Sequence, residues 1–358
     1  MIGLPQIDIT FARLAESLIQ RSSSGIVALI IKDSTDSNYE IKEYKAIPKI
    51  ESGKYTPTNL QYIKDVLSGG AAKVIVVPVD PVSDAVVGSA LQALGSRKYN
   101  WIGLAEGAAD EQLDLTAFIK EQEAAKKSVK GLVYNVAAPD CQHVVNFVNE
   151  SVTYLDGRTV TGDKFVPRLL GVLAGLPLTR SSTYYSFNDL VSVKEPADVE
   201  AAINSGKFVL FNDEDTVRVA RGVNSLTTLS PTTSDDFKKI LIVETMDLIR
   251  EDITNTFKND YVGKFRNTTD NQILLITSVN RYFATLGGED VLDPLYANKA
   301  DINVDLQRAA WVESGRTEAE EWDDQTVRNQ PFRSNVYLRG NIKIPDAMED
   351  LAFGVELQ

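Results

Sequence analysis

The two ends of this chain constrain its fold most, because each alternates apolar and polar residues with no adjacent strand to pair with. Residues 351–358 read LAFGVELQ, so every second side chain is apolar and faces one way. A period of two predicts a half-buried strand. Residues 6–11 repeat the pattern more briefly. The apolar faces of the two predicted terminal strands consist of Ile7, Ile9, Phe11, Leu351, Phe353, Val355 and Leu357.

A strand at a chain end has two possible partners. Its unpaired N–H and C=O groups are a template for association with another chain, and a donated strand completes a neighbouring subunit's sheet. In the alternative, both ends fold back and pair within their own domain. The pattern alone leaves both arrangements open.

The composition is that of a globular protein with more than one domain. The chain has 358 residues, of which 43% are hydrophobic and 24% charged, enough for two or three domains. Its net charge of -13 and the lack of a Lys/Arg run predict no nucleic-acid partner. A single cysteine excludes an internal disulfide and fits a reducing compartment.

We also expect no membrane insertion. The longest nearly apolar stretch, residues 166–178, is interrupted by Arg168 and is too short to span a bilayer. The first residues lack the basic start of a signal peptide. These features predict a soluble protein made in the cytoplasm.

From residue 25 onward, strands alternate with helices, which predicts a doubly wound α/β domain with a parallel sheet. Residues 34–58 have weak periodicity and are interpreted as a hairpin or surface loop. The predicted strands cover 26–31, 73–79, 99–104 and 131–136, and the predicted helices cover 60–67, 82–94 and 111–128.

After about residue 150 the pattern becomes α+β. Two strands are joined by a turn at 212–215, and a long helix is expected over 234–265 because its apolar residues recur every three or four positions. The other predicted elements are helices over 165–176 and 269–288, an acidic helical region over 303–326 and a strand near 336–344.

The sequence contains no catalytic constellation. No GxGxxG follows the first strand, and no GxxxxGK[ST] occurs anywhere. Asp80 and Glu106 follow predicted strands, where ligands of α/β proteins bind, but such carboxylates are more often solvated loop residues. We therefore predict no catalytic residues and no cofactor.

Cys141 and His143 form the only Cys-x-His pair, and His143 is the only histidine. A structural zinc needs about four such ligands, and a Cys–His nucleophile at this spacing on one helix would have poor geometry. We interpret the pair as a small buried thiol and a surface histidine near a helix start, and predict no metal site.

Four segments of the second half are distinctive in their order along the chain: PADVEAAINSG at 196–206, VRVARGVNSLTTL at 217–229, YVGKFRN at 261–267 and PDAMED at 345–350. Together they resemble the tail sheath family of contractile phage tails and R-type bacteriocins. The resemblance covers residues 157–358 and the N-terminal arm, whereas the first α/β domain matches only in its position.

The resemblance implies a structural protein rather than an enzyme. Sheath subunits form hexameric rings stacked helically around a rigid tube, and their partners are the tube, baseplate and tail terminator proteins. Their terminal arms add strands to neighbouring subunits, and the extended lattice stores the free energy that contraction releases. Such a subunit is assembled in the bacterial cytoplasm and becomes part of a released phage tail or bacteriocin particle.

On this interpretation the chain has four parts, with Pro345 and Asp346 in a hinge before the last strand. The tube-facing residues stay open between the acidic region 313–324 and the basic-rich loop 258–266. The predicted parts are an N-terminal arm and linker (1–24), an outer α/β domain (25–150), an assembly domain (151–344) and a C-terminal arm (345–358).

Other functions remain as alternatives. The chief alternative is an α/β nucleotide-binding enzyme with an oligomerisation domain, which would form an oligomer of one size that nucleotide stabilises. A sheath of a secretion or toxin-delivery system, or another lattice protein such as an adhesin, would share the self-assembly.

Overall fold

A computed structural model describes residues 19–22, 24–231 and 233–356 of the chain. The described residues form two compact units, one within 22–250 together with 346–356 and one of residues 19–21 with 251–345. The chain therefore passes from one unit to the other at 21/22, 250/251 and 345/346. The predicted strand residues Ile7, Ile9, Phe11 and Leu357 lie outside the described residues.

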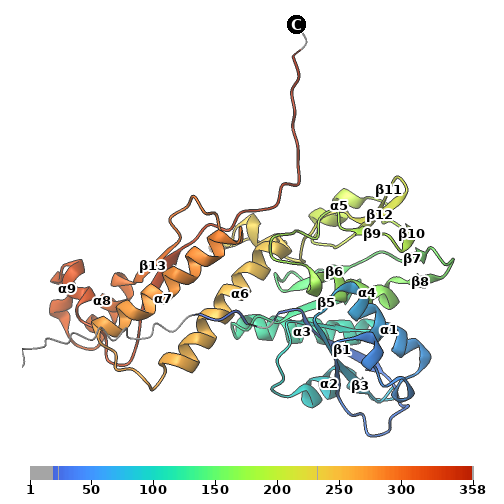
Figure 1. Ribbon diagram of the computed structural model, residues 1–358, viewed down its shortest axis with the longest axis horizontal. Helices are drawn as coiled ribbons and strands as arrows, with labels where there is room; N and C mark the ends of the chain where they lie inside the picture. Colours follow the sequence, from blue (N-terminus) through green and yellow to red (C-terminus); the bar gives the residue numbers. More distant parts are fainter. Residues whose placement is uncertain (1–18, 23, 232, 357–358) are drawn as a thin grey trace, which may run out of the picture. The chain divides into compact units, whose positions relative to one another are not determined.

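The first unit is built on a six-stranded sheet in the order β2-β3-β1-β4-β5-β6. Strands β1, β3, β5 and β6 of this sheet are labelled in Figure 1. Five strands are parallel, and β2 pairs antiparallel to β3 at one edge. The central strands are continuous apolar runs because both faces of the sheet are covered. The strands are β1 (Ile26–Lys32), β2 (Lys42–Tyr44), β3 (Lys73–Val79), β4 (Trp101–Leu104), β5 (Lys130–Tyr134) and β6 (Val144–Phe147).

Two helices cover each face of this sheet. Alternate strand residues, such as Leu29 and Ile30, belong to separate apolar cores on the two faces. Helices α1 (Pro57–Gly69) and α4 (Gly162–Gly175) contribute to one core, and α2 (Val86–Leu94) and α3 (Ala109–Ala124) to the other. The mixed α/β fold predicted from the sequence is confirmed, whereas the predicted domain boundaries stay predictions.

Helices α1 and α4 touch through glycines. A Cβ atom added to Gly171 would lie 2.1 Å from the carbonyl oxygen of Val66, and one added to Gly69 would lie 2.5 Å from the backbone of Gly171. Real Cβ atoms do not approach backbone so closely, so the two helices can pack at this distance only because residues 69 and 171 are glycines. This contact lets α4, far along the chain, share one face of the sheet with α1.

The rest of the first unit includes two small antiparallel sheets. Asn149 is fully buried beside them, and its side chain bonds the N–H and C=O of Leu210 at 2.7 Å each. The elements are β7 (Ser151–Tyr154), β8 (Thr159–Thr161) and β10 (Leu190–Val193) in one sheet, β9 (Ser186–Phe187), β11 (Leu210–Asp213) and β12 (Thr216–Val219) in the other, and helix α5 (Val199–Asn204).

Helix α6 (Ile240–Thr256) crosses the boundary between the units, so the chain enters the second unit within a helix. The predicted helix over 234–265 is thus shorter, because a 3₁₀ turn (η3, Asp235–Lys238) precedes it and a π turn (η4, Phe257–Tyr261) follows it.

Helix α7 (Thr269–Gly288) matches its predicted range. The side chain of Thr268 caps it by accepting from the N–H of Asn271 at 3.4 Å. The second unit also contains β13 (Lys299–Ile302), which pairs antiparallel with β14 (Leu338–Asn341), and the helical segments α8 (Val304–Glu313), η5 (Thr317–Glu321) and α9 (Asp324–Arg328). None of the helices among the described residues is both long and apolar enough to cross a bilayer.

Candidate assembly site

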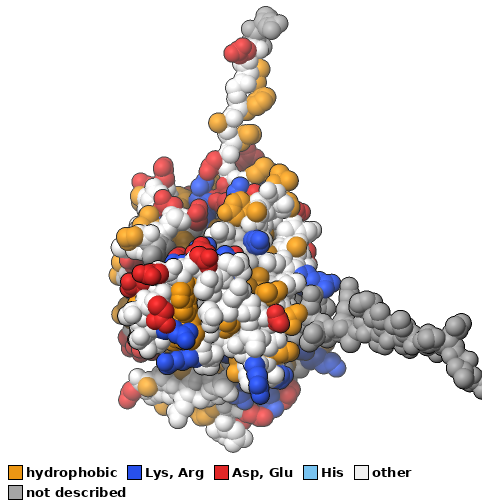
Figure 2. All heavy atoms as spheres, turned by 90° about the vertical axis from the view of Figure 1, so that its left-hand side faces the viewer, with side chains coloured by type: hydrophobic (Ala, Val, Ile, Leu, Met, Phe, Trp, Pro, Cys, Tyr) orange, Lys and Arg blue, Asp and Glu red, His pale blue; other side chains and the backbone are white. Residues whose placement is uncertain are grey.

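The described part of the C-terminal segment is extended and exposed. Leu351, Phe353 and Val355 are 91%, 80% and 68% exposed. Figure 1 shows the segment leaving the fold as an extended chain, and Figure 2 shows its apolar side chains in the open. Among the described residues, 351–356 pair with no other strand. Residues 351–356 therefore do not fold back and pair with a strand of the described part of this chain. Strand donation to another subunit stays a prediction.

The segment is fixed at its base by Glu349, whose side chain is only 4% exposed. Its carboxylate pairs with the ammonium of Lys239 and accepts a hydrogen bond from the Thr183 hydroxyl at 2.5 Å. Ser181 donates a further bond at 3.1 Å, and a guanidinium nitrogen of Arg221 lies 3.7 Å away. A buried charge is tolerated only when it is paired and hydrogen-bonded in this way.

These donors also set the charge state of Glu349. Burial alone would raise the pKa of its carboxyl, but the hydrogen bonds from Lys239 and Thr183 outweigh burial and hold the pKa below its usual value. Glu349 is therefore ionised at neutral pH, and the contact is a true ion pair.

Two exposed acids flank this anchor. Asp350 Oδ1 lies 2.6 Å from Arg221 Nη2, and Asp346 Oδ2 lies 3.2 Å from Lys239 Nζ. The Asp350 side chain is 78% exposed, and such surface pairs contribute at most about 1 kcal/mol. Most of the attachment energy therefore belongs to Glu349.

The cations come from the ends of two elements. Arg221 follows β12 in the stretch VRVARGVNSL, and Lys239 stands directly before α6. Sequence reasoning did not identify Glu349, Arg221 or Lys239. The only signal was the acidic spacing of PDAMED, which is meaningful once its basic partners, more than a hundred residues earlier, are known.

The predicted hinge residues lie where the chain crosses between the two compact units. Pro345 is the last residue of one unit and Asp346 the first of the returning segment. The role of these two residues as a hinge stays a prediction.

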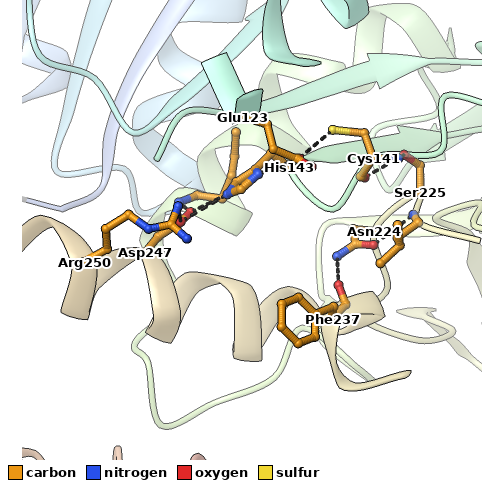
Figure 3. Close-up of polar contacts among 10 residues, drawn as sticks. Glu123, Cys141, His143, Asn224, Ser225, Phe237, Asp247 and Arg250 are labelled. Carbon is orange, nitrogen blue, oxygen red and sulfur yellow. Dashed lines mark hydrogen bonds and ion pairs between the residues drawn. The ribbon is translucent and has the colours of Figure 1, made fainter. Parts of the chain in front are cut away.

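The prediction of a surface histidine near a helix start is wrong. His143 is 1% exposed and directly precedes strand β6. Its Nδ1 lies 2.7 Å from Glu123 Oε2, and its Nε2 lies 3.1 Å from both carboxylate oxygens of Asp247 (Figure 3). Residues 144–147 form a strand that had not been predicted, and this strand carries the histidine into the interior.

Cys141 is buried, as expected, and its thiol donates to Glu123 at 2.9 Å. Burial and this carboxylate raise the pKa of the thiol far above its usual value. A thiol held protonated is a poor nucleophile. In the described part of the chain, no group of three or more His, Cys, Asp or Glu side chains is placed to hold a metal ion.

Asp80 and Glu106 have local structural partners. Asp80 accepts from the N–H of Val82 at 3.0 Å, which stabilises the turn after β3. Glu106 accepts from the hydroxyl of Tyr62, and Lys164 lies 3.7 Å from it. The structure thus gives each carboxylate an ordinary role in holding a loop.

Comparison with known proteins agrees with a sheath. The profile of the phage tail sheath C-terminal domain matches residues 232–358. The tail sheath protein of Clostridium phage phiCD119 is 31% identical over 369 aligned residues, which cover 100% of both chains.

Solved sheath structures share the fold. The sheath tail protein of Desulfitobacterium hafniense superposes with a TM-score of 0.70 at 16% identity, covering 83% of this chain and 93% of its own. The helical sheath of the anti-feeding prophage, solved in its contracted state, superposes with a TM-score of 0.69 at 10% identity, covering 99% of each chain. Together with the full-length relative, these matches show that the chain belongs to the tail sheath protein family.

Proposed function

We propose that this chain is the structural subunit of a contractile sheath, polymerising as hexameric rings stacked helically around a rigid tube. Contraction of the polymer would drive the tube through a target cell envelope. The observation that carries the proposal is the exposed apolar stripe of Leu351, Phe353 and Val355, held at its base by the buried Glu349. A stripe exposed in one subunit but patterned for burial points to another subunit as its partner.

A donated strand would contribute energy to such a lattice in two ways. Each backbone hydrogen bond contributes about 0.5–1.5 kcal/mol, and burial of each large apolar side chain adds about 1.5–3 kcal/mol. Three exposed apolar residues of the described segment and several ladder bonds would offset the cost of ordering the strand, and the contribution would be repeated at every subunit. Ile7, Ile9 and Phe11 would supply a second donated strand, and Leu357 would extend the first.

The contacts to other components follow from the same proposal. The partners would be a tail tube protein, a baseplate and a tail terminator, with assembly in the bacterial cytoplasm and release in a phage tail or bacteriocin particle. Hinges at Pro345 and Asp346 would let subunits rotate while their strands stay paired. The extended lattice would be metastable, and contraction would need no nucleotide, consistent with a sequence that has no phosphate-binding loop.

Electron microscopy of the purified full-length chain tests the proposal. We expect negatively stained tubes or stacked rings from the wild type, and only small particles from a variant that lacks residues 351–358. Deletion should leave the fold intact, because residues 351–356 contribute no buried side chain. Tubes of normal length from the deletion variant would overturn strand donation.

A pair of point variants on opposite faces of the segment gives a sharper test. Phe353→Asp places a charge on the apolar stripe and should abolish tubes, whereas Ala352→Asp places it on the other face and should be tolerated. If the wild type forms no tubes alone, co-expression with a tube protein supplies the template. Equal behaviour of the two variants on that template would contradict a one-sided apolar interface.

A further inference from the structure

A buried ion network surrounds the only histidine of the chain, within the first unit. His143 contacts Glu123 at the end of α3 and Asp247 on α6, and Cys141 contacts the same Glu123. Asp247 also lies 3.1 Å from the ammonium of Lys130 on β5 and 3.7 Å from Arg250. Lys130 lies 3.2 Å from Glu244, also on α6. The network thus joins the first half of α6 to the last two strands of the sheet, β5 and β6.

The geometry requires a charged imidazole. Each ring nitrogen faces a carboxylate oxygen, so both must carry a proton to donate. The ion pairs then balance, with carboxylates at Glu123, Asp247 and Glu244 and cations at His143, Lys130 and Arg250. Loss of the proton would turn a nitrogen lone pair toward a carboxylate and leave one negative charge uncompensated.

We propose that His143 is a proton-dependent latch, which fastens the first half of α6 to the β5–β6 edge when it is charged and releases it when neutral. An uncompensated charge in a buried site is costly, so deprotonation weakens the attachment of α6 to the sheet edge.

The sign of the pH dependence follows from the surroundings. Burial would lower the pKa of His143, but its hydrogen bonds to Asp247 and Glu123 outweigh burial and raise the pKa above the usual value. A group with a raised pKa in the closed state stabilises that state fully below its ordinary pKa of about 6.5. The stabilisation is lost as the pH rises from there through the raised pKa.

The latch is connected to the anchor of the C-terminal segment. Ser225 bonds the main chain of Cys141 at 3.2 Å and 2.9 Å, and Asn224 donates to the Phe237 carbonyl at 2.7 Å (Figure 3). In the sequence, Arg221 lies three residues before Asn224, and Lys239 lies two residues after Phe237. Both of these basic residues hold Glu349. Release of α6 would therefore also loosen the base of the exposed segment.

Hydrogen–deuterium exchange at the imidazole C2 position, read by mass spectrometry, measures the pKa of the latch directly. The untagged full-length chain contains one histidine, so the signal belongs to His143 alone. We expect a pKa above 6.5 in the wild type. Glu123→Gln should lower it, because one of the two carboxylates is neutralised. A wild-type pKa at or below the ordinary value would overturn the latch.

Backbone amide exchange tests the release itself. Between pH 6.5 and the raised pKa, opening of residues 240–250 should increase up to about tenfold per pH unit. Helix α2 is the internal control, because it packs on the same sheet and has no ionisable side chain.

His143→Gln should show weak protection of α6 that no longer varies with pH. If that variant does not fold, Glu123→Gln should shift the pH range downward. Opening of wild-type α6 that is independent of pH would contradict the proposal.

Discussion

Two neighbouring residues, Glu349 and Asp350, illustrate how burial decides the value of a charge. Both carboxylates lie near Arg221, but the Glu349 side chain is 4% exposed and that of Asp350 is 78% exposed. Water screens the outer pair, whereas the inner one is surrounded by donors from Lys239 and Thr183. An ion pair between a carboxylate and a basic side chain therefore serves as an anchor at Glu349 and only as a surface contact at Asp350.

We expect Glu349→Gln to weaken the attachment of residues 346–350 by about 1–3 kcal/mol, because it removes a charged partner from a buried site. Asp350→Asn is the matched control and should cost at most about 1 kcal/mol. Hydrogen–deuterium exchange of the backbone amides in a peptide covering residues 346–350 measures the effect of both substitutions. Equal effects of the two substitutions would show that burial does not govern the attachment.

The anchor should also be sensitive to acid. The pKa of Glu349 is lowered in the folded chain, so its stabilisation is complete above the ordinary value of about 4.5 and is lost as the pH falls below it. Pepsin cleavage within the anchored residues 346–350 should accelerate in the wild type as the pH falls through this range. In Glu349→Gln the cleavage rate should follow only the intrinsic pH profile of the protease.

At the scale of elements, the contact of α1 with α4 depends on glycine rather than on apolar side chains. Gly171→Ala should destabilise the first unit by at least about 3 kcal/mol, since the new methyl would meet the Val66 carbonyl. Gly88→Ala in the exposed face of α2 is the control, with no atom nearer than 3.9 Å. It should be neutral or stabilising by about 0.5–1 kcal/mol. Urea denaturation of both variants checks the prediction, which equal midpoints would contradict.

Elements with local signals could be predicted from the sequence. Strand β3 and helix α7 match their predicted ranges, because each is a long pattern bounded by glycines or a cap. Strand β6 was missed, since VVNF is too short to distinguish from a loop and its Asn146 is buried by bonds to Val136. The burial of His143 could not be predicted either, because it depends on Asp247, more than a hundred residues away in the sequence.

The assembly site likewise has one part that local sequence pattern predicts and one part that it does not. Alternation along 351–356 predicted its apolar stripe from local pattern alone, and the structure leaves that stripe exposed. The anchor at Glu349 combines residues from the end of β12, the start of α6 and the loop before β9. Such a combination is a property of the tertiary fold, which single-sequence patterns do not encode.

At the scale of the whole molecule, each subunit would both donate and accept a strand. A subunit that lacks residues 351–358 can still accept one, so it should enter a growing tube and stop growth there. Mixing it with wild-type chains should shorten tubes as its fraction rises, measured as mean length in electron micrographs. Tube length that does not depend on the mixture would indicate that the two populations do not associate.

The position of Glu349, two residues before the exposed segment, has a mechanical consequence. A pulling force on that segment would be transmitted through Glu349 to Lys239 and Arg221 before it reached Pro345. The load would enter at the start of α6 and the end of β12, inside the larger compact unit. The predicted hinge at Pro345 would then carry none of this load.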